Sequence, residues 1–155
     1  MNNKLNAFIR SFIRDRHIAV LATMQGSQPI VSTVFYVVGD CGQIYFKSRT
    51  DSLHSKSFTV SPKAAFAIYD HQSTYDDKTG VQIIGTVTRV IERSEMKIVV
   101  DLYSCKFGAS AAKKLQLDDL LSSETKSTMY LLDVGKVKLV SHELDIHMPE
   151  YESLL

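Results

Sequence analysis

The sequence contains no tryptophan, only two cysteines and three prolines, and no strong excess of either charge. Cys41 and Cys105 lie far apart and form no CxxC pair, so we expect two free thiols in a reducing cytoplasm. No apolar run approaches the ~20 residues that span a bilayer, and arginines interrupt the apolar N-terminus, so neither a membrane helix nor a secretory signal is expected. The net charge of +1 gives no bulk electrostatic reason to expect nucleic acid as a partner.

What remains is the composition of an ordinary globular protein, with 45% hydrophobic and 23% charged residues. A chain of 155 residues favours one domain over 1–155. An amphipathic helix is predicted at 3–14, from an apolar stripe at helical spacing. Period-two alternation and β-branched residues predict strands at 17–24, 29–38, 43–48, 63–70, 81–92 and 128–143. The first of these strands is apolar at nearly every position, so we expect it to be buried on both faces.

Short turns join the strands, and no βαβ rhythm is present. The fold class predicted is therefore α+β, mainly β, with a closed or nearly closed six-stranded antiparallel barrel and flanking helices. Gly85 in the fifth strand and Gly135 in the sixth predict β-bulges, where the barrel bends. The tail 144–155 has no clear period, so we expect a covering loop or a frayed end.

Two helices are expected between the last two long strands, at 94–107 and 109–121. Ser94 can cap the first helix, and Gly108 follows its last residue, where glycine is favoured. The residues that we expect on the buried face of the first helix are Ile98, Val99, Leu102 and Cys105.

The stretch 43–62 is the strongest candidate for a functional site. It begins as a strand, breaks into a run of hydroxyl and charged residues, and continues as a short helix that carries His54 and Lys56. This order suits a phosphate, because free N–H groups and the positive end of the helix dipole face the anion. It lacks the glycines of a P-loop or a Rossmann turn. A solvated turn and helix face is the simpler alternative for the same residues.

The order of elements, together with LATMQGSQPIVSTVFYVV, QIYFKS and SLHSKSFTVSPKAAFAI, resembles the split-barrel flavoproteins related to pyridoxamine 5'-phosphate oxidase. The resemblance implies a Greek-key split barrel that forms a homodimer and binds FMN across the subunit interface. The residues that it places at the cofactor are Ser32, Thr33 and Val34 near the ring; Phe46, Lys47 and Ser48 near the ring and ribityl chain; Arg49, Ser52, His54 and Lys56 near the phosphate; and Gln82 as a candidate contact from the fifth strand.

The sequence departs from the oxidase in two places. Leu53 and His54 occupy positions where the family often has two cations, a pattern similar to an uncharacterised bacterial branch of the family. The chain also lacks tryptophan and an arginine-rich end, so oxidation of pyridoxamine phosphate is not expected. The function predicted is an FMN-dependent oxidoreductase acting on a small molecule, with no catalytic residue and no metal ligand assigned. The alternative is a non-catalytic binder of flavin or of haem, with His142 or His147 as the haem ligand.

Overall fold

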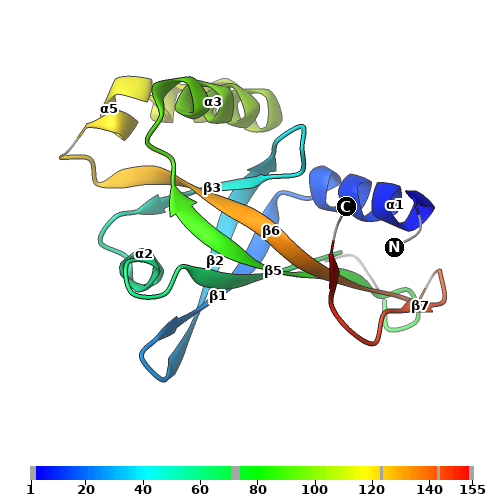
Figure 1. Ribbon diagram of the computed structural model, residues 1–155. Helices are drawn as coiled ribbons and strands as arrows, with labels where there is room; N and C mark the ends of the chain where they lie inside the picture. Colours follow the sequence, from blue (N-terminus) through cyan, green and yellow to red (C-terminus); the bar gives the residue numbers. More distant parts are fainter. Residues whose placement is uncertain (1–2, 71–73, 123, 143, 154–155) are drawn as a thin grey trace.

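The computed structural model describes residues 3–70, 74–122, 124–142 and 144–153 (Figure 1). Its helices are α1 (Asn3–Asp15), α2 (Leu53–Phe58), α3 (Arg93–Phe107), α4 (Ala109–Lys114) and α5 (Leu117–Leu121). Its strands are β1 (Ile18–Gln25), β2 (Gln28–Val38), β3 (Ile44–Arg49), β4 (Lys63–Tyr69), β5 (Thr79–Arg89), β6 (Ser127–Ser141), β7 (Ile146–His147) and β8 (Glu152–Ser153). The six strands predicted from alternation are all present, with slightly different bounds.

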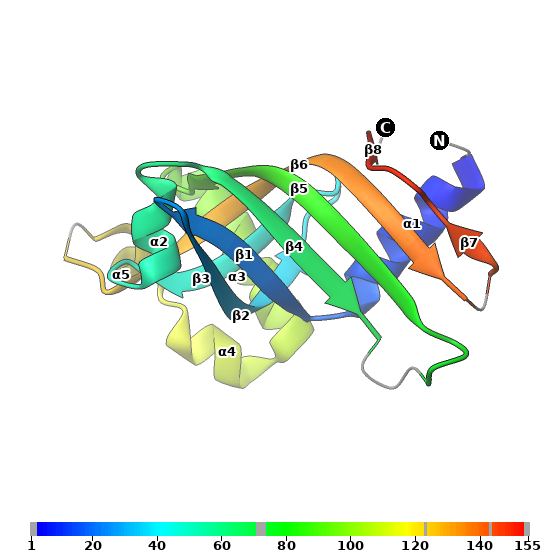
Figure 2. The ribbon, with the colours of Figure 1, turned by 90° about the horizontal axis from the view of Figure 1, so that it is seen from below.

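The first six strands form a closed antiparallel barrel. Their spatial order is β3-β2-β1-β4-β5-β6, and pairing of β3 with β6 closes the ring. β4 returns to lie beside β1 after the β1–β2–β3 meander, which is the Greek-key arrangement. Figure 2 shows β1, β4, β5 and β6 side by side. The predicted six-stranded antiparallel Greek-key barrel with flanking helices is therefore confirmed.

A β-bulge bends the long β5–β6 ladder where the sequence predicted it. The register shifts between Ile84 and Gly85, and Gly135 of β6 is the extra residue. A Cβ atom on Gly85 would lie 2.2 Å from the carbonyl oxygen of Asp133, well inside van der Waals contact. The two backbones can approach this closely only because Gly85 has no side chain.

Two apolar cores lie on opposite sides of the β2–β3–β6 wall. The first fills the barrel and extends to α1, whose buried residues Ile9, Phe12 and Ile13 come from the predicted stripe. The second lies between the outside of the barrel and the α3–α5 segment, which covers it in Figure 1. The residues of this second core are Val37, Tyr45, Val90, Met96, Val99, Tyr103, Leu115, Leu120 and Met129.

The predicted buried face of α3 is correct for Val99 and Leu102, which belong to or pack against the second core, and wrong for Ile98 and Cys105. Ile98 is 56% exposed and Cys105 is also exposed, whereas Met96, Val99 and Tyr103 are buried. Both sets obey helical spacing, so the stripe is rotated around the helix axis rather than absent. The helix also begins earlier than predicted, with Glu92 rather than Ser94 at the N-cap.

The predicted helix at 109–121 is two short helices. α4 ends at Lys114 and α5 begins at Leu117, and Leu115 between them is buried in the second core. The prediction of a single helix is therefore wrong, and Leu115 fixes the connection between α4 and α5 to the second core.

The tail is neither a simple loop nor frayed in its described part. β7 and β8 both pair with β6, and Met148 between them is buried in the barrel core. Its sulfur accepts a hydrogen bond from the backbone N–H of Leu139. The tail is therefore anchored to the outside and the end of the barrel.

β1 is buried on one face only, which corrects the expectation of two buried faces. Ala19 and Leu21 point into the barrel, whereas Ile18 and Met24 are largely exposed on the outside. Among the described helices, none has both the length and the apolar character that a bilayer crossing requires.

Candidate functional site

The barrel opens between β2 and β3. Their ladder ends at the pair Tyr36–Phe46, although β2 continues to pair with β1 and β3 continues to pair with β6. The N–H of Tyr36 donates to the carbonyl of His17 on the β1 side (3.1 Å). Alternation along an antiparallel strand therefore turns the backbone N–H and C=O of Thr33 and Phe35 toward β3, into the opening.

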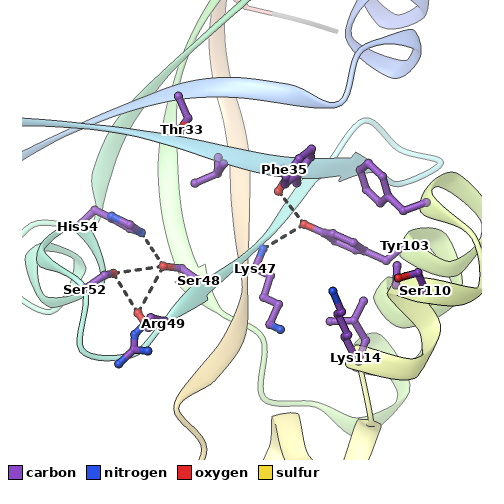
Figure 3. Close-up of a pocket in the computed structure, with 14 residues that line it drawn as sticks. Thr33, Phe35, Lys47, Ser48, Arg49, Ser52, His54, Tyr103, Ser110 and Lys114 are labelled. Carbon is purple, nitrogen blue, oxygen red and sulfur yellow. Dashed lines mark hydrogen bonds between the residues drawn. The ribbon is translucent and has the colours of Figure 1, made fainter.

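A pocket of about 560 Å³ lies in this opening (Figure 3). β2 and β3 form two of its walls, α2 closes one end, and α3 with α4 closes the other. The lining residues are Thr33, Val34, Phe35, Lys47, Ser48, Arg49, Ser52, His54, Tyr103, Phe107, Ser110, Ala111, Lys114 and Leu115. Its volume is within the range of small-molecule and cofactor sites.

The pocket lining carries an excess of positive charge. Lys47, Arg49 and Lys114 line it, and no carboxylate does among the described residues. The Arg49 guanidinium forms a two-point ion pair with Asp51 outside the pocket, with distances of 2.7 and 2.8 Å. The ammonium groups of Lys47 and Lys114 form no hydrogen bond or ion pair with another described residue. An anionic ligand would therefore gain charge-assisted hydrogen bonds here.

The strand, polar turn and helix predicted for this stretch are present as β3, the turn and α2. Ser52 caps α2, because its hydroxyl accepts from the N–H of Ser55 (3.3 Å). The hydroxyls of Ser48, Ser52 and Ser55 lie within 2.8–3.2 Å of one another. They give the α2 end of the pocket a compact set of donors and acceptors.

His54 bridges the two strands at this end. Its Nδ1 lies 3.0 Å from the hydroxyl of Ser32 on β2, and its Nε2 lies 2.5 Å from the hydroxyl of Ser48 on β3. Burial lowers the pKa of His54, because the half-buried imidazolium would lose hydration. A neutral imidazole therefore fits this setting better than an imidazolium.

An aromatic wall closes the opposite end. The Tyr103 and Phe107 rings are 5.3 Å apart, and Phe107 meets Phe35 edge-on at 5.5 Å. His17 stacks on the outer side of Phe35 at 6.5 Å. Phe35 remains 56% exposed in spite of these contacts. The wall therefore presents aromatic surface to the pocket and to the outer face of the barrel.

The chain matches the family model described as pyridoxamine 5'-phosphate oxidase over residues 5–140. The chain belongs to this family. No curated protein matches it. The matched residues include the opening between β2 and β3, which we call the split, and the α3–α4 wall. The whole pocket therefore lies within the part of the chain that matches the family model.

Solved structures support the same fold. A conserved hypothetical protein, Rv2991 from Mycobacterium tuberculosis, is 23% identical, with a TM-score of 0.74 over 100% of this chain and 95% of its own. A heme binding protein from Mycobacterium smegmatis is 17% identical, with a TM-score of 0.76 over 99% of this chain and 60% of its own. HutZ, the heme storage protein of Vibrio cholerae, is 17% identical, with a TM-score of 0.68 over 87% of this chain and 92% of its own.

Most of the residues that the family resemblance placed at the cofactor lie together. Those that line the pocket are Thr33, Val34, Lys47, Ser48, Arg49, Ser52 and His54. Ser32 lies behind the lining, bonded to His54. Phe46 does not line the pocket, because its side chain is fully buried in the barrel core against Tyr130.

The other two predicted residues lie elsewhere in this family member. Lys56 is exposed on α2, outside the pocket lining. Gln82 is on the outside of β5, where the Tyr151 hydroxyl donates to its side-chain oxygen (3.0 Å). Gln82 is not among the residues that line the pocket of its own chain, so its contact with the flavin stays a prediction.

Sequence reasoning missed the α3–α4 side of the pocket. No functional role was predicted for Tyr103, Ser110 or Lys114, which line the pocket on this side. A usable signal existed for Tyr103, since Met96, Val99 and Tyr103 follow helical spacing. Nothing in the sequence indicated that α4 lies opposite β3.

Proposed function

We propose that the protein is a flavoprotein that binds FMN in the opening between β2 and β3. The observation that carries this proposal is the pocket itself, an aromatic and apolar cleft with cations but no described carboxylate in its lining. FMN combines a flat apolar ring with a phosphate, so it requires these two environments side by side. Membership of the pyridoxamine 5'-phosphate oxidase family supports the same choice.

The residues present fit such a ligand. The outward N–H and C=O of Thr33 and the outward N–H of Phe35 offer an edge of donors and an acceptor to the polar rim of a flavin ring, whereas the Phe35 carbonyl already accepts from the Tyr103 hydroxyl. Lys47 and the Ser48–Ser52 hydroxyls are placed to hold a phosphate at the α2 end, and Arg49 could join them by leaving Asp51. FMN, when bound, would supply hydride or electron transfer, and the protein would orient the ring and exclude water.

We further propose that the functional unit is a homodimer with the cofactor at the subunit interface. Cross-strand neighbours give the outside of β1, β2, β4 and β5 a continuous apolar surface, of which the pocket residues Thr33 and Phe35 form one edge. The residues of this outer apolar face are Ile18, Val20, Ala22, Met24, Val31, Phe35, Ala65, Ala67 and Ile84. An exposed apolar face that continues across four strands favours a protein partner.

Replacement of Val31 by glutamate tests the interface, since Val31 is 68% exposed on β2, the strand of the face that borders the pocket. We expect Val31→Glu to shift the sedimentation coefficient from dimer to monomer and to weaken FMN binding. Ile98→Glu, on the exposed side of α3, is the matched control and should change neither. A monomeric wild-type protein that binds FMN normally would contradict the interface and leave the flavin site intact.

The direct test of the cofactor is a visible spectrum of the purified protein, followed by titration of the apoprotein with FMN and riboflavin. We expect flavin absorption bands, or FMN binding at micromolar concentration or tighter, with FMN bound more tightly than riboflavin. The absence of both would refute the flavin site. Anaerobic reduction of the bound flavin by NAD(P)H, with steady turnover, would then distinguish an oxidoreductase from a binder.

A non-catalytic binder is the second candidate. The observation that favours it is that no carboxylate lines the described pocket, and that His54 and the Tyr103 hydroxyl hydrogen bond to protein groups that hold the strands in place. Haem is the other ligand to consider, since two similar structures are named for haem. His142 and His147 lie near β7, at the end of the barrel opposite α2 and the pocket (Figures 1 and 2). A haem spectrum lost in His142→Ala or His147→Ala would support haem instead of FMN. A cytoplasmic location stays a prediction.

A further inference from the structure

The point where β2 and β3 separate is occupied by a side chain from a third element. Val37 and Tyr45 face each other in the last part of the β2–β3 ladder, so the next hydrogen-bonded pair would be Phe35 with Lys47. That pair does not form directly. The N–H of Lys47 donates to the Tyr103 hydroxyl (3.1 Å), which in turn donates to the carbonyl of Phe35 (2.7 Å).

Figure 3 shows the Tyr103 hydroxyl pointing between the two strands, with a dashed line to each. One oxygen therefore takes the place of a ladder hydrogen bond and separates the strands by its own width. We propose that Tyr103 is a positioning residue that holds the split open at the width of the ligand pocket.

Three features of Tyr103 suit this role. Its side chain is 4% exposed and belongs to the second core with Met96 and Val99, so its ring is fixed. Burial raises the pKa of the Tyr103 hydroxyl, so the group stays protonated and keeps its donor. The same ring contacts Phe107, the last residue of α3 before α4. The hydroxyl therefore fixes both the spacing of β2 from β3 and the position of the α4 wall relative to β3.

His54 provides an independent bridge at the other end of the split, between Ser32 and Ser48. The two bridges differ in what they join. His54 joins side chains, whereas Tyr103 joins backbone groups at the fork itself. Removal of the Tyr103 hydroxyl leaves a backbone donor and a backbone acceptor without their partner at the edge of the pocket, and the remaining ring prevents the strands from closing on each other.

The test compares Tyr103→Phe with Tyr45→Phe. Tyr45 is a matched control because it is also a buried tyrosine of the second core with a bonded hydroxyl, in this case to Glu95 (3.0 Å), outside the pocket. Amide hydrogen exchange of the ligand-free protein, followed by NMR, gives the first readout. We expect exchange at Lys47 to become about tenfold faster in Tyr103→Phe and to stay at the wild-type rate in Tyr45→Phe. Unchanged or slower exchange at Lys47 in Tyr103→Phe would overturn the proposal.

The second readout rests on the proposed function, since it uses FMN as the probe. We expect Tyr103→Phe to weaken FMN about tenfold and Tyr45→Phe to change it by less than about twofold. Thermal unfolding of both variants separates a general loss of stability from a local effect. An equal loss of FMN affinity in the two variants would mean that Tyr103 does not set the width of the split. If the wild type binds no FMN, the flavin proposal fails, whereas the exchange measurement still decides the role of Tyr103.

Discussion

The barrel departs from regular antiparallel pairing in two places, the β5–β6 bulge and the β2–β3 split, and it handles them differently. At the bulge, Gly85 lets the backbones approach, and the ladder resumes on both sides. At the split, the ladder stops at Tyr36–Phe46, and the side chains of Tyr103 and His54 bridge the strands beyond it. The bulge leaves no space, whereas the split leaves a pocket. A close backbone contact therefore serves the fold, and a side-chain bridge leaves room for a ligand.

The largest expected effect comes from breaking the bulge. Gly85→Ala would place a methyl group 2.2 Å from the backbone oxygen of Asp133, and a backbone atom cannot rotate away. We expect a loss of about 3 kcal/mol or more in the free energy of unfolding, measured by urea denaturation, or failure to fold. Gly135→Ala is the graded control, because its Cβ would lie 3.2 Å from the Ile84 oxygen and requires only a small shift. Equal stability of the Gly85 and Gly135 variants would show that the close approach does not constrain the barrel.

The next effect concerns ligand affinity at the split, with stability unchanged. Lys47→Met removes an ammonium from the pocket lining and keeps the aliphatic stem. We expect FMN to bind about ten- to a hundredfold more weakly, a difference of ~1.5–3 kcal/mol, because a charge-assisted hydrogen bond to the phosphate is lost.

Two comparisons make the Lys47 result specific. Riboflavin lacks the phosphate, so its affinity should fall less than that of FMN in calorimetric titrations. Lys56→Met removes a cation from the same stretch but outside the pocket lining, and it should leave both affinities unchanged. An equal loss for FMN and riboflavin in Lys47→Met would place the phosphate elsewhere.

The smallest expected effect is on the pH dependence of stability, and it tests the bridge that His54 forms across the split. The pKa of His54 is lowered in the folded protein, so between that value and about 6.5 the unfolded chain binds more protons. The contribution of His54 to stability is thus complete above pH 6.5 or so and is lost as the pH falls. We expect His54→Gln to reduce the decrease in unfolding free energy between about pH 7 and pH 5. Identical pH dependence in the variant and the wild type would show that the bridge does not require a neutral imidazole.

The sequence predicted the barrel and the α2 end of the pocket because these depend on local patterns. Alternation of polar and apolar residues predicts the strands, and Gly85 and Gly135 mark the bulge. Ser52 lies in the sequence between a strand and a helix, where it caps the helix. Each of these signals lies within a few residues of the feature that it specifies.

The other half of the pocket was not predictable in the same way. Helical spacing allowed two faces of α3, and only packing against β2 and β3 selects the one with Tyr103. Lys114 lines the pocket because α4 lies opposite β3, a contact between segments far apart in the chain. Gln82 lies on the outside of β5, beside Ala67 of the proposed interface, so whether it reaches the flavin depends on a second subunit and stays a prediction. Contacts beyond the local sequence decide all three.

The closure of the barrel has a consequence for the order of folding. β3 supplies one wall of the pocket, and its second neighbour is β6, which pairs Ile44 with Leu132. These residues are about 90 positions apart, so their contact carries one of the larger loop-closure entropies in the chain and is expected to form late. A nascent chain can complete the β1–β2–β3 meander early, yet β3 remains an open edge until β6 has been synthesised. We therefore expect ligand binding to appear at the end of folding, which stopped-flow refolding monitored by flavin fluorescence would follow directly.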